Sequence, residues 1–89
     1  MCGLFASTGV DINQQLFLNS LDTLTHRGPD NTSHFFGPGF ALGHTRLSII
    51  DTNNCSNQPF FSSDGLHAIV YNGELFNYKD LAVSYNLNL

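Results

Sequence analysis

The residue best suited to chemistry in this sequence is Cys2, which directly follows Met1. Its small side chain is compatible with removal of the initiator methionine, so we expect Cys2 to become the first residue of the mature chain. A free α-amine has an ordinary pKa of about 7.7–8.0, which allows it to act as a general base toward its own thiol. The alternative is a structural role, because cysteine also serves as a small buried hydrophobic residue.

Asn72 and Gly73 follow an apolar stretch and could complete such a site. Acyl transfer needs N–H donors aimed at the oxyanion of the tetrahedral intermediate. An asparagine side chain and a backbone N–H from a glycine-containing turn supply such donors. Asn-Gly is also a common hairpin turn. The segment 74–80 reads as helical rather than strand-like, which weakens the hairpin alternative.

Two charged residues, Arg46 and Glu74, suit the charged groups of an amino-acid substrate. A guanidinium pairs with a carboxylate through two parallel hydrogen bonds, and a glutamate side chain attracts an ammonium group. Each residue could instead be a solvated surface charge. The chain has only three lysine and arginine residues. Because Arg46 ends an apolar, strand-like stretch, the pattern favours the binding role for it.

The composition excludes several classes of function. The 89-residue chain is 42 % hydrophobic and 11 % charged, with a formal net charge of −4, which is typical of a folded domain. Three basic residues cannot neutralise a run of phosphates, so we expect no nucleic-acid partner. No apolar run approaches the roughly 18 residues of a membrane span, and no secretory signal is visible. We therefore expect no membrane partner and a cytoplasmic location, in which Cys2 and Cys55 stay reduced.

The four histidines lack the close pairing of metal ligands, and the sequence has no Cys-x-x-Cys motif. We interpret His26 as part of a turn and the other three as structural, namely His34, His44 and His67. The sequence therefore predicts no metal site.

The first elements that must position these residues are a strand and a helix. The apolar pattern predicts a short buried strand over residues 2–7. Asp11 is predicted to cap a helix whose apolar positions are Phe17, Leu21 and Leu24. Residues 27–30 contain a glycine and a proline and must stop this helix.

The remaining elements are predominantly strands. Segments 32–36 and 40–46 are predicted to form a hairpin around the turn at 37–39. A third strand is predicted over 66–71, and a helix runs from 76 to about 83. This order indicates an α+β fold with an antiparallel sheet.

The candidate residues fall within five motifs that span nearly the whole chain. These are Met1-Cys2-Gly3-Leu4-Phe5, His26-Arg27-Gly28-Pro29-Asp30, Arg46-Leu47-Ser48-Ile49-Ile50-Asp51, Gln58-Pro59-Phe60 and Tyr71-Asn72-Gly73-Glu74-Leu75-Phe76-Asn77-Tyr78. On these motifs the chain resembles the class II glutamine amidotransferases of the N-terminal-nucleophile hydrolase superfamily. The proline of the second motif and the segment 47–51 favour the asparagine synthetase branch.

The resemblance implies catalytic roles for three residues. Cys2 would be the nucleophile, with its freed amine as the base, and Asn72 and the Gly73 N–H would form the oxyanion hole. The implied reaction is hydrolysis of glutamine to glutamate and ammonia through a thioester on Cys2. The implied fold is part of a four-layer α/β/β/α sandwich with antiparallel sheets.

The resemblance also implies how glutamine would bind. Arg46 would hold the substrate carboxylate, and Glu74 would help to bind the substrate amino group. The backbone around Ile49 and Ile50 would line the pocket.

Family members pass the ammonia to a synthetase domain that uses ATP and Mg²⁺ to activate aspartate for asparagine biosynthesis, whereas the glutaminase step needs no cofactor. We interpret residues 1–89 as the N-terminal part of a glutaminase domain, and expect a separate or downstream synthetase domain as partner. We expect little glutaminase activity from the isolated chain. The alternative function is that of a non-catalytic truncated remnant or interaction module.

Overall fold

The computed structural model describes residues 2–48 and 56–87 of the chain. In order along the chain, the elements are β1 (Gly3–Thr8), α1 (Gln14–Asp22), β2 (Asn31–Gly37), β3 (Phe40–Arg46), β4 (Phe60–Phe61), β5 (Ala68–Ile69) and α2 (Tyr78–Ser84). Strands β1, β3 and β2 form one sheet in that spatial order, and β4 pairs with β5 in a second. The three pairs of named strands in the described residues are antiparallel, and with the two helices they confirm the predicted α+β class.

Strand β3 is the central strand of the larger sheet. It pairs with β2 from Asn31↔Arg46 to Gly37↔Phe40, as the sequence predicted for this hairpin. On its other side it pairs with β1, which is an edge strand. Helix α1 covers only the face of β1 that carries Phe5, so alternate side chains on the other face are exposed, and Leu4 is 44 % exposed. The prediction of a buried first strand is therefore correct for one face only.

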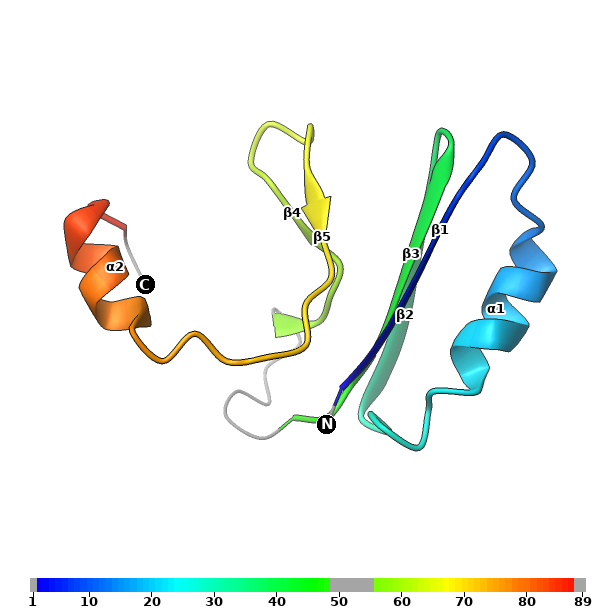
Figure 1. Ribbon diagram of the computed structural model, residues 1–89, viewed down its shortest axis with the longest axis horizontal. Helices are drawn as coiled ribbons and strands as arrows, with labels where there is room; N and C mark the ends of the chain where they lie inside the picture. The colour runs from blue at the N-terminus through cyan, green and yellow to red at the C-terminus, as the bar shows by residue number, and fades with distance from the viewer. Residues whose placement is uncertain (1, 49–55, 88–89) are drawn as a thin grey trace.

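Helix α1 covers one face of the sheet (Figure 1). Its buried side chains are Phe17 and Leu21. The Phe17 ring packs against Phe5 and Phe36, with centroids 5.0 and 5.4 Å away. A Cβ at Gly43 would come within 2.8 Å of the Leu21 side chain, so only glycine lets the helix approach β3 this closely.

The other face of the sheet turns toward the β4–β5 hairpin (Figure 1). The rings of Phe35 and Phe61 meet edge to face with centroids 4.9 Å apart, and thereby join β2 to β4. Helix α2 contributes one buried residue, Ala82. The core is thus concentrated between α1 and the larger sheet.

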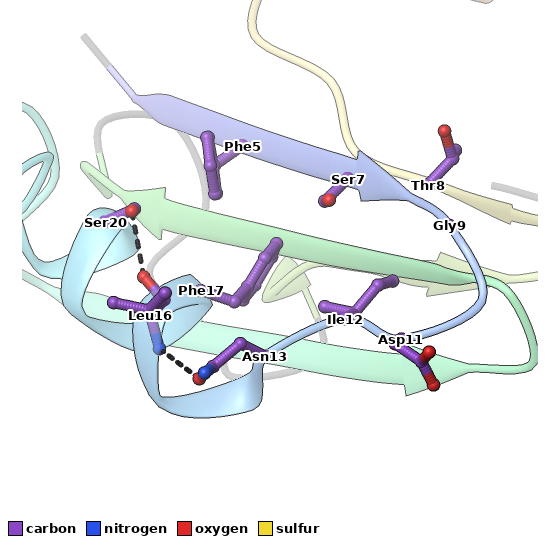
Figure 2. A pocket seen from close by; sticks show the side chains of 10 residues that line it. All are labelled: Phe5, Ser7, Thr8, Gly9, Asp11, Ile12, Asn13, Leu16, Phe17 and Ser20. Atoms are coloured by element: carbon purple, nitrogen blue, oxygen red, sulfur yellow. Dashed lines mark hydrogen bonds between the residues drawn. The ribbon is translucent and has the colours of Figure 1, made fainter.

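The N-cap of α1 differs from the prediction. Asn13, not Asp11, caps the helix, because its Oδ1 accepts a hydrogen bond from the Leu16 N–H at 3.0 Å (Figure 2). The helix also ends earlier, at Asp22, and the chain continues to Gly28 in hydrogen-bonded turns. Leu24 belongs to those turns and is half-buried.

The predicted strand over 66–71 is shorter in the structure, where β5 covers only Ala68–Ile69. Side chains satisfy the backbone at both ends of that segment. The Leu66 N–H donates to the Asp64 carboxylate at 2.9 Å, and the Tyr71 N–H donates to Oε1 of Gln58 at 2.5 Å. These groups are therefore not available to a strand ladder. The final helix, α2, agrees with its prediction to within two residues.

Candidate active site

Cys2 directly precedes β1 and is half-buried. Its Sγ accepts a hydrogen bond from the Leu47 N–H at 3.3 Å. The carbonyl oxygen of Cys2 accepts a second hydrogen bond from Nε of Arg27 at 3.2 Å. Two segments that are distant in sequence therefore hold the candidate nucleophile at one end of the sheet.

The pleat of the sheet decides which side chains share a face with Cys2. Side chains of successive strand residues point to opposite faces. Gly3 and Thr45 lie directly opposite each other and face α1, since a Cβ at Gly3 would touch the segment that follows this helix. Cys2 is the residue before Gly3, and Arg46 is the residue after Thr45; because the strands are antiparallel, both lie one step closer to the same end of the sheet. His44 is the residue before Thr45. These three side chains therefore belong to the face opposite α1.

Arg46 is the last residue of β3 and is only 6 % exposed. Its Nη1 donates to Oδ1 of Asn57 at 2.8 Å, and its carbonyl oxygen accepts from the Asp30 N–H at 2.9 Å. A buried guanidinium needs acceptors such as Oδ1 of Asn57 because water does not solvate it. The planar fork of donors suits the carboxylate of an amino acid.

Asn72, Gly73 and Glu74 lie in the loop between β5 and α2. Asn72 is half-buried and the other two are exposed. Among the described residues up to 87, a helix and no strand follows them, so Asn72 and Gly73 do not form the alternative hairpin turn there. Among residues 2–48 and 56–87, no hydrogen bond links the side chains of Asn72 or Glu74 to Cys2. The structure thus brings Cys2 and Arg46 to one face, and the roles of the Asn72 loop stay predictions.

The remaining predicted pocket residues, Ile49 and Ile50, lie outside the described residues, as does Cys55. Their predicted roles are unchanged by the structure.

The segment 26–30 packs against the end of β3 next to Cys2. A Cβ at Gly28 would overlap the Thr45 carbonyl, so glycine is required for the segment to lie this close. Asp30 holds the chain beyond β3, because its Oδ2 accepts from the Ser48 N–H at 2.7 Å. The motif that contains Arg27, Gly28 and Asp30 therefore positions the site, a role that its residue types alone did not indicate.

The sequence predicted no chemical role for two further residues at the site. His44 was interpreted as structural, and Gln58 was only part of a motif. Both contact the backbone of Tyr71, immediately before Asn72: Nε2 of His44 lies 3.3 Å and Nε2 of Gln58 lies 3.0 Å from the Tyr71 carbonyl oxygen. No sequence signal indicates these contacts, because they depend on the fold.

A hollow on the opposite side of the sheet is a separate feature. It lies between β1, α1 and the turn that joins them, with Phe5, Ile12 and Phe17 among its lining residues (Figure 2). Phe5 faces α1, whereas Cys2 and Arg46 belong to the other face. The hollow is therefore no part of the Cys2 site.

The described residues contain no group of three His, Cys, Asp or Glu side chains that could hold a metal ion. These residues offer no carboxylate cluster that fits Mg²⁺-ATP. Within the same residues, no helix has the length and apolar character needed to cross a membrane.

The chain was compared with models of known protein families. A glutamine amidotransferase domain model matches residues 1–88, so the chain belongs to this family. The resemblance identified from the motifs is thereby confirmed.

Individual relatives include both amidases and asparagine synthetases. Amidase chry2 of Gibberella zeae is 49 % identical over 63 residues, covering 67 % of this chain and 9 % of that protein. The probable glutamine-hydrolyzing asparagine synthetase of Acanthamoeba polyphaga mimivirus is 38 % identical over 96 residues, covering 100 % of this chain and 17 % of that protein. Glutamine-hydrolyzing asparagine synthetase 2 of Bacillus subtilis is 32 % identical over 90 residues, covering 94 % and 12 %.

The chain spans between 9 % and 17 % of the length of these relatives. No solved structure matches the chain.

Proposed function

We propose that this chain supplies the nucleophile and part of the substrate site of a glutaminase, which hydrolyses glutamine to glutamate and ammonia. The observation that carries the proposal is the placement of Cys2 and Arg46 at the same end and on the same face of the sheet. Membership of the glutamine amidotransferase family supports it. A thiol that shares a sheet face with a guanidinium suits an amino-acid substrate, whose carboxylate the guanidinium would bind while the thiol attacks the side chain.

The proposed reaction has two steps. In the first, Sγ of Cys2 forms a bond to the side-chain carbonyl carbon of glutamine, and its proton passes through the α-amine of the mature chain to the leaving nitrogen. The C–N bond breaks, ammonia departs and a thioester remains. In the second step, the oxygen of water bonds to the thioester carbon, the C–S bond breaks, a proton from water passes through the α-amine to the departing sulfur, and glutamate is released as the free thiol is regenerated.

The loop after β5 supplies the oxyanion donors in this proposal. The Asn72 amide and the Gly73 N–H stabilise the negative oxygen of each tetrahedral intermediate. Arg46 binds the α-carboxylate, Glu74 the α-amino group, and the backbone around Ile49 and Ile50 lines the pocket. Residues 1–89 would form part of the four-layer sandwich described above.

Asparagine synthetases among the relatives support aspartate, activated with ATP and Mg²⁺ on a synthetase domain, as the proposed ammonia acceptor. We place this activity in the cytoplasm. Amidases are also among the relatives. The competing outcomes are therefore a different ammonia acceptor, or amide hydrolysis without any acceptor.

The test is active-site labelling of the complete natural protein that carries this chain. A chloroketone analogue of glutamine is expected to add once, at Cys2 and not at Cys55, and the intact mass is expected to lack one methionine. Replacement Cys2→Ala should abolish labelling and ammonia release, whereas Cys55→Ala should preserve both. Labelling of Cys55 alone, or an active protein that retains Met1, would contradict the assignment. A protein that is neither labelled nor active would be the non-catalytic module.

A further inference from the structure

His44 is the most deeply buried titratable residue among those described, with 0 % of its side chain exposed. It lies near the end of β3, two residues before Arg46, on the face of the sheet opposite α1. Its ring therefore points from a rigid central strand toward the segment that follows β5.

The ring of His44 meets the backbone of Tyr71. Nε2 of His44 lies 3.3 Å from the Tyr71 carbonyl oxygen, which also accepts a hydrogen bond from Nε2 of Gln58 at 3.0 Å. The N–H of Tyr71 donates to Oε1 of the same Gln58 side chain at 2.5 Å. A carbonyl oxygen has two lone pairs, so His44 and Gln58 together use both. Three hydrogen bonds thus fix one residue in a loop that has no regular structure.

The protonation state of His44 follows from its partners. A carbonyl oxygen can only accept, so Nε2 must carry the proton that is shared with Tyr71. The other ring nitrogen, Nδ1, is buried and has no partner among the described residues. A second proton there would create a buried N–H without an acceptor, close to the Arg46 guanidinium, which is unfavourable. His44 is thus a neutral donor with its proton on Nε2.

Tyr71 is covalently joined to Asn72, and Gly73 follows. We propose that His44 is a positioning residue which, with Gln58, holds the Tyr71 peptide and thereby aims the Asn72 amide and the Gly73 N–H at the oxyanion. This inference rests on the proposed glutaminase function. Oxyanion donors are effective only within a narrow range of distance from the developing charge, so a loop without a rigid support would lose much of their effect. The buried ring on β3 connects that loop to the sheet that holds Cys2 and Arg46.

The first test compares variants of the complete protein that carries this chain. Replacement His44→Leu removes the donor and is expected to lower kcat for glutamine hydrolysis by about tenfold or more, with KM within about twofold of wild type. In His44→Gln, the side-chain amide nitrogen lies near the position of Nε2, so most of the kcat should return. His67→Leu is the matched control, because His67 is exposed in the loop before β5.

A double-mutant comparison separates positioning from general damage to the fold. In an Asn72→Ala background only the Gly73 N–H is left for His44 to position, so His44→Leu should lower kcat by less there than in the wild type, by less than about threefold. The inference would be overturned if the double variant lost kcat by the full product of the two single losses. A His44→Leu variant with wild-type kcat would also overturn it. If His44→Leu does not fold, Gln58→Glu removes the other donor to the same carbonyl and is expected to lower kcat without raising KM.

A second test is independent of activity. Nitrogen-15 NMR of the His44 ring in the wild-type protein should show a neutral imidazole protonated on Nε2. A proton on Nδ1 would overturn the inference even if the enzyme is active. A different result would refute the proposed function instead: the wild type shows the expected ring state but releases no ammonia that depends on Cys2. The contact between His44 and Tyr71 would then be purely structural.

Discussion

The chemistry of Arg46 depends on the geometry of its guanidinium as well as on its charge. The side chain is 6 % exposed and one of its N–H groups is oriented by Asn57. A planar group held in this way presents a fixed fork of donors, whereas a lysine ammonium is a point charge on a flexible stem. At a site of this kind the two residues are not interchangeable.

Replacement Arg46→Lys should therefore weaken glutamine binding more than it slows chemistry. We expect KM for glutamine to rise by about 10- to 100-fold, because hydrogen bonds to charged groups contribute about 1.5–3 kcal/mol, while kcat stays within about threefold. Steady-state glutaminase kinetics measure both constants, and thermal unfolding verifies that the variant is folded. Lys79→Arg, in α2, is the control and should change neither. A lower kcat at unchanged KM would remove Arg46 from the substrate carboxylate.

The residue types of the candidate site could be predicted, but their supports could not. Cys2, Arg46 and Asn72 carry groups whose chemistry is evident from the sequence. His44 and Gln58 act through the backbone of Tyr71, which is 27 and 13 residues away respectively. Such a contact exists only after the strands are in register, so no local pattern indicates it.

At the scale of elements, the start of α1 distinguishes two candidate caps. Asn13 caps the helix through its side chain, whereas Asp11 lies in the preceding turn. Asn13→Ala should lower the free energy of unfolding by about 0.5–2 kcal/mol, the usual effect of losing an N-cap. Asp11→Ala should change it by less than about 0.5 kcal/mol. Urea unfolding followed by circular dichroism measures both values, and the opposite ranking would restore Asp11 as the cap.

The packing of α1 on β3 depends on Leu21, which is 1 % exposed and lies against Gly43. Leu21→Ala should lower the free energy of unfolding by about 2–5 kcal/mol, because it leaves a cavity that the rigid sheet cannot close. Leu16 in the same helix is 62 % exposed, so Leu16→Ala is the matched control and should have an effect below about 0.5 kcal/mol. Equal effects of the two substitutions in denaturant unfolding would show that α1 does not pack as described.

Elements with strong local patterns were predicted well. The β2–β3 hairpin has its glycine turn and alternating residues, and both helices have their apolar positions. Strand β4 was not predicted because two residues, Phe60 and Phe61, are too short to give a pattern. The third predicted strand was too long because the side chains of Asp64 and Gln58 bind backbone groups at its two ends.

At the scale of the whole molecule, the apolar core occupies only part of the chain. The radius of gyration is 14.4 Å, compared with about 12 Å for a compact chain of this length. Large apolar side chains stay exposed in the C-terminal half, including Leu66 at 77 %, Phe76 at 90 % and Val83 at 83 %. The stability of the described residues therefore comes mainly from α1 and the three-stranded sheet.

His44 also gives the fold a dependence on pH. Burial lowers the pKa of His44 below its ordinary 6.5; the hydrogen bond to the Tyr71 carbonyl opposes this shift, and the charge of Arg46 adds to it. Between the folded and unfolded pKa values the unfolded chain binds more protons. The contribution of His44 to stability is therefore fully present above about pH 6.5 and is lost as the pH falls below it.

This dependence can be measured by urea unfolding between pH 5 and pH 8. The free energy of unfolding of the wild type should fall toward acidic pH more steeply than that of His44→Gln, which has no group to titrate at this position. If His44→Gln and the wild type had the same slope, another group would have to account for the loss at acidic pH.

The hydrogen bonds from Arg27 and Leu47 to Cys2 have a consequence for the synthesis of the protein on the ribosome. Cys2 is among the first residues to be translated, whereas the two residues that hold it follow 25 and 45 positions later. A nascent chain therefore carries an ordinary, unrestrained thiol until β3 has been synthesised and has paired with β1. Under the proposed function, glutaminase activity would begin only when β1 has paired with β3, and not when Cys2 is synthesised.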